Sequence, residues 1–540
     1  MHTKQWQAVC GYVTDVCESV SGSGGTMREL FDLITEDKNS VIYSWTENGR
    51  PLYIRRDAFR RKVVSVARKL ADCLPDAHGV IGLHLENGPY WPVFYWAILM
   101  SGHTPLILDS RHELFYYRSL QAVSGVRVIT EDKNYPSVLS PEILKNSRSD
   151  VDPAYFDRLW ADETLFVGEQ EDGTLRLISR SGLALGRQLL RLRHVYQYNQ
   201  AMFHPDQFGR MRMSVSLPFS DLFGFLCGMV FYPCFGCEQH ISAPDADAGR
   251  YLASCRSLAV THLCVSAETC AGMTALVTQQ AEKSFPRDAS RYLAWLRGEE
   301  RINDFRILSR FMSFSAKIMK AVFGKKIRCV LCTDPALDET APHLFTRLGV
   351  FFGNGYCVPE LGLVSMELSA DPEVRIKGSA GILLNGIVGM VLDGRNLMLD
   401  CGSDAGQYCT PEGYQPFPSP FPVGARVAFD RNNRLLIAQD HAKQSSGAQQ
   451  KADPETVLKM RELYAAVLNK PLDIIDEDMD FFAALGGDSL SYFLLLQHIE
   501  LLFGIQIKPE ERIYFSTARY AAETLKPYTQ AKKGEVKNHA

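Results

Sequence analysis

The stretch FFAALGGDSL, residues 481–490, decides how the C-terminal part of this chain folds. Apolar residues recur at helical spacing after Ser489, so we predict a helix that begins at this serine. The unpaired amides and the dipole of a helix N-terminus favour an anionic group, and the glycines before the serine let another backbone approach closely. No histidine stands next to Ser489, so the pattern indicates a serine that receives a modification rather than a nucleophile with its own base.

This stretch resembles the phosphopantetheine attachment site of carrier domains, and of peptidyl carriers in particular. The resemblance covers residues 453–528 and implies an all-α four-helix domain in which Ser489 carries 4'-phosphopantetheine. Gly487, Asp488 and Leu490 complete the expected attachment site, where Asp488 can share a divalent metal with the incoming phosphate donor. The alternative is a helix-capping serine in an unrelated helical bundle.

Charge separates this region from the rest of the chain. Residues 453–530 contain thirteen acidic and seven basic side chains, a net charge of −6, whereas the 540-residue chain carries −4. An acidic carrier suits docking on basic faces of partner enzymes, and the near-neutral remainder gives no footprint for nucleic acid. We predict a helix and flexible connector at 1–25, a large domain at 26–440, a linker at 441–452, the carrier domain at 453–530 and a tail at 531–540.

Fourteen cysteines are scattered through apolar stretches rather than spaced as a disulfide framework. No signal peptide precedes them, and the longest apolar run, residues 222–237, is too short and interrupted to span a bilayer. We therefore expect a cytoplasmic protein without a membrane span. Two Cys-x-x-Cys pairs, at 234–237 and 329–332, leave a structural zinc site as an alternative, but the second pair lies in a run typical of a buried strand, so we expect no metal site.

Short apolar runs alternate with a helical pattern in the N-terminal region. Residues 79–85 and 104–109 are predicted strands, and residues 90–100 between them are a predicted helix. Strands that alternate with helices indicate a layered α/β architecture with a parallel sheet.

The segments of this region resemble, in order, the N-terminal part of the adenylate-forming superfamily, which contains acyl-CoA synthetases, adenylation domains of peptide synthetases and luciferases. The resemblance covers residues 26–440 and implies two mixed sheets and a distorted barrel. A basic helical stretch at 305–326 is similar to the spacer of long-chain acyl-CoA synthetases. The matching segments are VIGL (80–83), ENGP (86–89), AILMSG (97–102) and PLILD (105–109).

The phosphate loop of this superfamily corresponds to residues 179–188, SRSGLALGRQ. Such a loop holds phosphates through backbone amides, hydroxyl groups and a lysine. Here leucine and alanine replace the hydroxyl groups and no lysine ends the segment. Ser181, Gly182 and Gly186 remain from the nucleotide site, and we expect a structural loop rather than a phosphate cradle.

A second ATP motif corresponds to residues 355–360, GYCVPE. Tyr356 and Glu360 are retained, and the resemblance implies a magnesium-binding role for this glutamate. Pro359 replaces the threonine that would contact the AMP phosphate, and a carboxylate alone is a weak metal site. Upstream, Asp221 stands where many acyl-activating members carry a histidine.

The remaining motifs of the superfamily are lost as well. Ala425 replaces the aspartate that binds the ribose hydroxyls, and Gln439-Asp440 replaces the hinge Gly-Arg. A missing acceptor for a ligand hydroxyl costs orders of magnitude in binding. Residues 442–452 then lead directly into the carrier region, so the C-terminal subdomain with the catalytic lysine is missing. These losses argue against ATP and Mg²⁺ as cofactors.

We therefore interpret the chain as a carrier protein with a pseudo-adenylation domain and no catalytic residues of its own. A phosphopantetheinyl transferase would modify Ser489, a separate enzyme would load an acyl or aminoacyl thioester, and downstream tailoring or condensing enzymes would use it. The large domain would dock the loading enzyme, shelter the bound group or act as a scaffold. Two alternatives stay open: an active ATP-dependent acid ligase that loads its own carrier domain, and a structural partner whose serine is never modified.

Overall fold

The computed structural model describes most of the chain between Gly25 and Ala522. Several predicted features lie outside the described residues. They are residues 1–24 of the predicted helix and connector, the linker at 441–452, the tail, Gly487, Asp488, Gln439 and Asp440. The described ranges are 25–74, 78–120, 126–132, 138–145, 153–169, 175–191, 211–242, 247–333, 340–369, 371–375, 379–384, 387–392, 396–400, 406–410, 413–417, 421–429, 434–437, 454–477, 479, 481, 485, 489–503, 517–519 and 521–522.

The chain forms two compact units. Unit 1 contains residues 1–387, 401–417 and 430–436, and unit 2 contains residues 388–400, 418–429 and 437–540. The predicted domain limits at 440 and 453 fall outside the described residues and stay a prediction.

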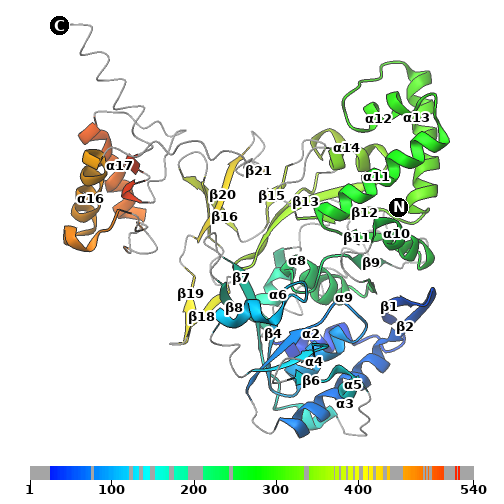
Figure 1. The fold of residues 1–540 in the computed structure, drawn as a ribbon, viewed down its shortest axis with the longest axis horizontal. Coiled ribbons are helices and arrows are strands. Elements are labelled where there is room, and N and C mark those ends of the chain that lie inside the picture. Colours follow the sequence, from blue (N-terminus) through cyan, green and yellow to red (C-terminus); the bar gives the residue numbers. More distant parts are fainter. Residues whose placement is uncertain are drawn as a thin grey trace. The chain divides into compact units, whose positions relative to one another are not determined.

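The larger sheet of unit 1 has nine strands in the order β15-β14-β13-β12-β11-β9-β10-β1-β2 (Figure 1). Its six central strands are parallel, and antiparallel pairs stand at both ends. The predicted buried strand at 329–332 is confirmed as β12. The bounds are β15 (Ile382–Leu383), β14 (Gly362–Met366), β13 (Phe351–Val358), β12 (Cys329–Cys332), β11 (His262–Cys264), β9 (Arg212–Val215), β10 (Glu238–Ile241), β1 (Val41–Glu47) and β2 (Arg50–Arg55).

The second sheet of unit 1 has eight strands in the order β19-β18-β8-β7-β4-β3-β5-β6. Strands β4, β3, β5 and β6 are parallel to their neighbours, whereas β7, β8, β18 and β19 form an antiparallel half. The bounds are β19 (Gly413–Pro416), β18 (Gln407–Thr410), β8 (Leu175–Ser181), β7 (Glu163–Glu169), β4 (Thr104–Ile107), β3 (Val80–His84), β5 (Arg127–Thr130) and β6 (Val138–Leu139). Both strands and the helix predicted here are confirmed.

Helix α4 (Trp91–Met100) fills the core beside this sheet, and every residue of the helix is buried. Its aromatic rings pack on one another and on Phe225 of α8, with centroids 5.2 Å apart for Tyr95 and Phe225. The other helical segments of this part are α2 (Met27–Ile34), α3 (Arg56–Cys73), η1 (Leu114–Ser119), α5 (Pro141–Lys145), η3 (Pro153–Phe156), α6 (Gly182–Arg191), α8 (Leu222–Phe225), the π-helical η5 (Leu226–Phe231) and α9 (Tyr232–Cys234).

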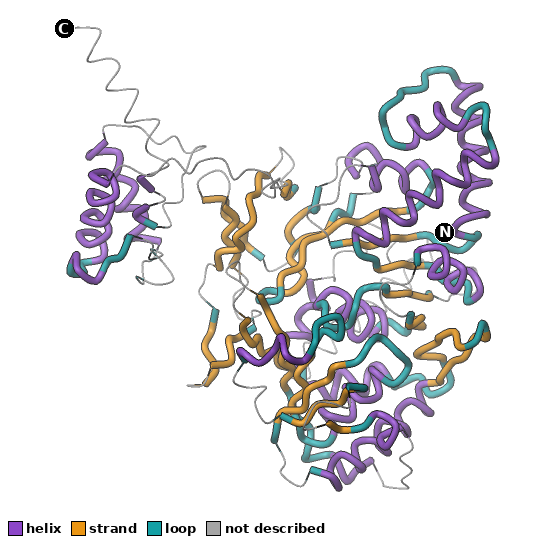
Figure 2. Tube along the Cα trace, in the orientation of Figure 1, coloured by secondary structure: helices purple, strands orange, loops and turns teal. Residues whose placement is uncertain are grey.

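A second helical group accompanies β11 to β13 (Figure 2). It encloses its own apolar core, which includes Tyr292, Phe311 and Phe345. Alternating strands and helices thus confirm the predicted layered α/β class. The helical segments of this group are α10 (Ala248–Ser257), α11 (Ala267–Ser284), α12 (Ala289–Leu296), α13 (Phe305–Ile318), the π-helical η6 (Met319–Phe323), α14 (Thr340–Arg347) and α15 (Pro372–Arg375).

Unit 2 contains a small antiparallel sheet and a helical domain. The sheet pairs β16 (Val388–Leu392), β17 (Asn396–Asp400) and β20 (Phe421–Phe429). The short strand β21 (Leu435–Ile437) comes next in the chain, and only its last residue belongs to unit 2. The helical domain contains α16 (Pro454–Leu468), the turn η8 (Leu472–Ile474) and α17 (Ser489–Phe503). Among the described helices, none is both long and apolar enough to cross a membrane.

Candidate functional site

Ser489 is the first residue of α17, as its sequence pattern predicts. Helix α17 is held by Leu495 and Ile499, which are buried with Tyr464 of α16 and with Phe481. The rings of Tyr464 and Phe481 meet edge to face at 5.1 Å. The first amides of a fifteen-residue helix have no intrahelical partner, so the backbone at Ser489 suits the anionic phosphodiester of phosphopantetheine.

The segment expected to form a structural loop in place of the phosphate loop has a different conformation. Strand β8 ends at Ser181, and α6 begins at the next residue, Gly182. Gly186 lies inside this helix rather than at a turn. The prediction of a loop is wrong because Leu185 and Leu189 are spaced to enter the core from one helical face, and both are fully buried.

Gly182 is enclosed by the protein's own backbone. Its N–H donates to the carbonyl oxygen of Asp162 at 3.0 Å, and the Asp162 carboxylate accepts from the Met27 amide at 2.7 Å. A Cβ atom at Gly182 would lie 2.3 Å from the Met27 nitrogen and 2.5 Å from the Thr26 carbonyl carbon. The start of α6 therefore has no open space beside Gly182.

Buried polar side chains connect β8 and α6 to the corner between β13 and β14. Arg180 donates to the Pro359 carbonyl at 2.6 Å. Arg191 donates to the carbonyl oxygens of Leu361 at 2.6 Å and Leu363 at 3.0 Å. The sequence interpretation missed both arginines, although a basic residue inside an apolar strand or helix is a signal for such a buried contact, since charged residues are rarely buried without a partner.

Glu360 belongs to this corner. Burial raises the pKa of Glu360 above its usual value, and the nearby charges of Arg180 and Arg176 oppose the rise. Tyr356 is buried within β13, and burial together with the Glu360 charge raises the pKa of its hydroxyl. Within the described part of the chain, no group of three or more His, Cys, Asp or Glu side chains is arranged to hold a metal ion.

A cavity of about 220 Å³ lies between β4, β7 and the segment before α8. Pro359 is part of its wall, so the cavity adjoins the segment 355–360 that is predicted to correspond to an ATP motif. Its polar wall consists of Asp109, Arg111, His112, Tyr116, Tyr117, Ser220 and Asp221, and its apolar wall of Ile107, Phe166, Val167, Leu175, Leu222 and Pro359.

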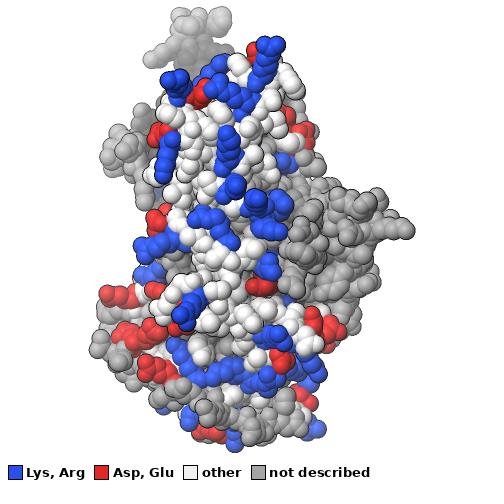
Figure 3. All heavy atoms as spheres, turned by 90° about the vertical axis from the view of Figure 1, so that its right-hand side faces the viewer, with Lys and Arg blue, Asp and Glu red and all other residues white. Residues whose placement is uncertain are grey.

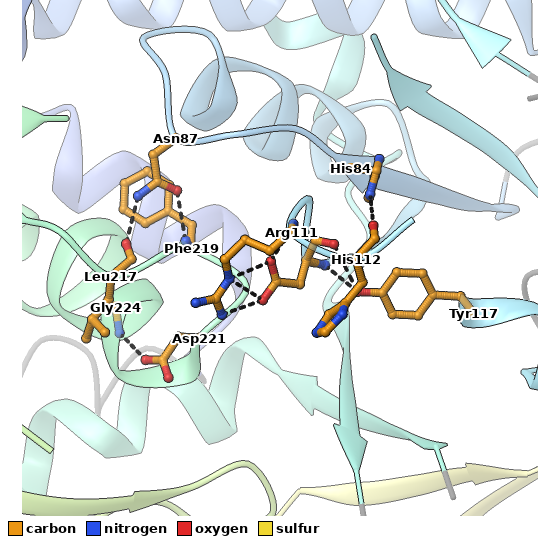
Figure 4. Close-up of polar contacts among 10 residues, drawn as sticks. His84, Asn87, Arg111, His112, Tyr117, Leu217, Phe219, Asp221 and Gly224 are labelled. Atoms are coloured by element: carbon orange, nitrogen blue, oxygen red, sulfur yellow. Dashed lines mark hydrogen bonds and ion pairs between the residues drawn. The ribbon is translucent and has the colours of Figure 1, made fainter. Parts of the chain in front are cut away.

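Arg111 and Asp109 form an ion pair on this wall, with the Arg111 Nη2 and Asp109 Oδ2 atoms 2.6 Å apart. Burial raises the pKa of Asp109, but the hydrogen bonds and charge of Arg111 outweigh it and hold this pKa below the usual value. The Asp109 amide donates to the Tyr117 hydroxyl at 2.8 Å, which holds the turn after β4. Figure 4 shows Arg111 reaching from this turn toward Asp221.

Asp221 caps α8, because its Oδ1 accepts from the Gly224 amide at 2.9 Å. Burial raises the pKa of Asp221, and the Gly224 amide and the Arg111 charge oppose the rise. Asn87 holds the preceding turn by donating to the Leu217 carbonyl at 2.7 Å and accepting from the Phe219 amide at 2.9 Å (Figure 4). The cavity can hold a small polar organic molecule. No lysine of the described residues lines it.

Comparisons with known proteins bear on both units. The model of the family described as "Phosphopantetheine attachment site" matches residues 459–519. No curated protein matches this sequence. The structure is similar to the Klebsiella oxytoca NpsA N-terminal subdomain solved with 3-hydroxyanthranilyl-AMSN, at 14% identity and a TM-score of 0.52, covering 77% of this chain and 99% of that chain.

Two further solved structures have the same likeness. Unliganded o-succinylbenzoate coenzyme A synthetase (MenE) from Bacillus subtilis has 11% identity and a TM-score of 0.54, covering 81% of this chain and 87% of that chain. The luciferase-like enzyme from the mealworm Zophobas morio has 12% identity and a TM-score of 0.51, covering 76% and 93%. The chain thus joins an N-terminal region with the adenylate-forming fold to a phosphopantetheine-binding carrier domain, and both predicted resemblances are confirmed.

Proposed function

We propose that this protein is a carrier whose Ser489 bears 4'-phosphopantetheine, attached by a phosphopantetheinyl transferase. Gly487, Asp488 and Leu490 complete the attachment site. The bound group supplies a thiol, and a separate activating enzyme places an acyl or aminoacyl group on it for downstream tailoring or condensing enzymes. The match of residues 459–519 to the attachment-site family and the start of α17 at Ser489 support this proposal.

The adenylate-forming region is, in this proposal, a pseudoenzyme. The observation that carries this part is the direct passage from β8 into α6 at Gly182, where Met27 and Asp162 enclose the backbone. A phosphate loop needs successive amides that face a ligand, whereas the α6 amides after the first turn are bonded within the helix. Such a domain serves to dock the loading enzyme, shelter the carried group or act as a scaffold.

The second candidate is an active ATP-dependent acid ligase that loads its own Ser489. It is favoured by the cavity of about 220 Å³, which adjoins Pro359 and is of a size for a small organic acid. Glu360, the retained acidic residue of the ATP motif, lies next to Pro359 in the chain. The fourteen scattered cysteines, which suit a reducing compartment, support a cytoplasmic location for either candidate.

The test is the mass of the intact full-length protein after incubation with coenzyme A and a broad-specificity phosphopantetheinyl transferase. The wild type should gain one phosphopantetheine. Ser489→Ala should gain none, and Ser491→Ala, a matched change two residues further along α17, should be modified like the wild type. Equal masses for unmodified and treated wild type would refute the carrier proposal.

The modified protein is then incubated with ATP and a pool of fatty, aryl and amino acids. We expect no further mass and no acid-dependent exchange of pyrophosphate into ATP. Additional ATP-dependent mass that requires Ser489 would show that the domain activates its own substrate, and it would replace the pseudoenzyme proposal with the ligase.

A further inference from the structure

Helix α13 (Phe305–Ile318) has an exposed face that the core of unit 1 does not use. Its opposite face enters the apolar core through Phe311, Phe314 and Ile318. On the exposed face Phe305 is 81% exposed, the largest value for a large hydrophobic residue in the described part of the chain, and Met312 is 61% exposed. Seven residues separate the two, so they lie within about 20° of each other around the helix and roughly 10 Å apart along it.

Exposed basic side chains lie on the same helical segments as this apolar strip and directly after them in the chain. Arg306 and Lys320 are exposed on α13 and η6, and Lys325 and Arg328 are exposed just after them. None of these four forms an ion pair with another described residue. We call Phe305, Met312 and these four cations the α13 face.

Few acids offset this charge. Residues 297–328 contain nine basic and three acidic side chains, in a chain whose total charge is −4. Glu300 is paired with Arg291 at 2.7 Å, and Asp304 accepts from the Arg306 and Ile307 amides as the cap of α13. Figure 3, which views the side of the molecule where α13 is drawn in Figure 1, shows Lys and Arg gathered over its upper half with few acids.

We propose that the α13 face binds the surface of an anionic lipid bilayer. Phe305 and Met312 enter the boundary between headgroups and acyl chains, and the bordering lysines and arginines contact lipid phosphates. Exposed apolar side chains that enter the headgroup boundary, together with Lys and Arg that contact lipid phosphates, hold a protein at an anionic membrane surface without crossing it. The inference does not depend on the state of Ser489.

The composition of the face favours a membrane over an acidic protein. Lysine is depleted in protein interfaces, whose centres are packed and dry, whereas anionic lipid surfaces attract lysine and arginine alike without a fixed geometry. A stable protein interface also covers about 800 Å² on each partner, with buried anchor residues that fill pockets. The α13 face instead has a strip of two apolar side chains, and its exposed cations lie on α13 and η6 and just after them.

The test is co-flotation of the full-length protein with vesicles of phosphatidylcholine alone and of phosphatidylcholine with phosphatidylglycerol. We expect binding to the anionic vesicles only, weakened by salt. Lys320→Glu with Lys325→Glu should lower the partition coefficient at least about 30-fold, because each basic residue near an anionic surface contributes roughly a factor of five. Lys38→Glu with Arg127→Glu makes the same change in net charge elsewhere and should leave binding nearly unchanged.

The apolar contribution is tested with Phe305→Ser and Met312→Ser together, which should lower the partition coefficient about tenfold or more. Both residues are exposed, so the fold should not change, and Tyr53→Ser, an exposed aromatic of β2, is the matched control. Equal binding to both kinds of vesicle, absence of binding, or equal losses in the control variants would overturn the proposal. So would binding to anionic vesicles that the serine variants do not affect, because that result leaves Phe305 and Met312 without a part in it.

Discussion

Replacing Gly182 by alanine tests whether the protein's own backbone closes the space beside the start of α6. The added Cβ would lie 2.3 Å from the Met27 nitrogen, 2.5 Å from the Thr26 carbonyl carbon and 2.6 Å from the Asp162 carboxylate. Two of these atoms are backbone and cannot rotate away, so the overpacking cost lies near the upper end of about 1–3 kcal/mol. Displacing Asp162 from the Met27 amide adds about 1 kcal/mol to this cost. The higher helix propensity of alanine offsets about 0.5–1 kcal/mol of it. We expect Gly182→Ala to lower the free energy of unfolding by about 3 kcal/mol.

Urea unfolding followed by tryptophan fluorescence measures this loss. All six tryptophans lie in the first 295 residues, within unit 1, so the signal reports that unit and not the carrier domain. Gly88→Ala is the matched control, since its Cβ would have only the Glu86 carbonyl oxygen within 4 Å, at 3.8 Å. The control should stay within about 0.5 kcal/mol of the wild type. A Gly182→Ala variant as stable as the control would refute the reasoning and mean that the start of α6 has room for a ligand.

Three further predictions follow from individual side chains. Arg191→Met should lower the free energy of unfolding by about 2–4 kcal/mol in the same assay, because the buried carbonyl oxygens of Leu361 and Leu363 lose their donor. A decrease in this free energy of less than about 1 kcal/mol would contradict the prediction. Burial raises the pKa of Asp221 above the unfolded value of 3.8, so the stability that its protonated form contributes is present at lower pH and is lost as pH rises through the folded pKa. Asp221→Asn keeps the helix cap and should therefore gain stability relative to the wild type as the pH rises from acidic to neutral. Parallel profiles of stability against pH for the two proteins would contradict this prediction. Phe481→Ala should lower the free energy of unfolding of the carrier domain by about 3–5 kcal/mol and make residues 454–503 sensitive to proteolysis. The tryptophan transition of unit 1 should stay at the wild-type position. Unchanged proteolysis would show that this ring is not part of the core.

Features that depend on neighbouring residues could be predicted from the sequence. The start of α17 at Ser489 follows from hydrophobic periodicity, and the strands β3 and β12 and the buried helix α4 follow from short apolar runs. The resemblances to carrier domains and to the adenylate-forming superfamily could also be predicted from the sequence, because they rest on short motifs in a fixed order. The carrier match and the likeness to adenylate-forming structures confirmed them.

Features that depend on distant residues could not be predicted. The segment 179–188 contains glycines that suit a loop, yet burial of Leu185 and Leu189 makes it a strand followed by a helix. Arg180 and Arg191 find their acceptors about 170–180 positions away along the chain, at Pro359 and Leu361. Local propensity carries no information about such partners.

The sequence by itself therefore determined which serine is the candidate for modification and the class of the fold, and it carries the prediction that the ATP motifs are degraded, because each of these depends on residue types at short spacing. Only the tertiary structure decided which conformation residues 179–188 adopt, which residues wall the cavity and which face of α13 is left exposed. Those features arise where segments distant in the chain pack together, and buried polar groups there take whichever partners the packing brings within hydrogen-bonding distance.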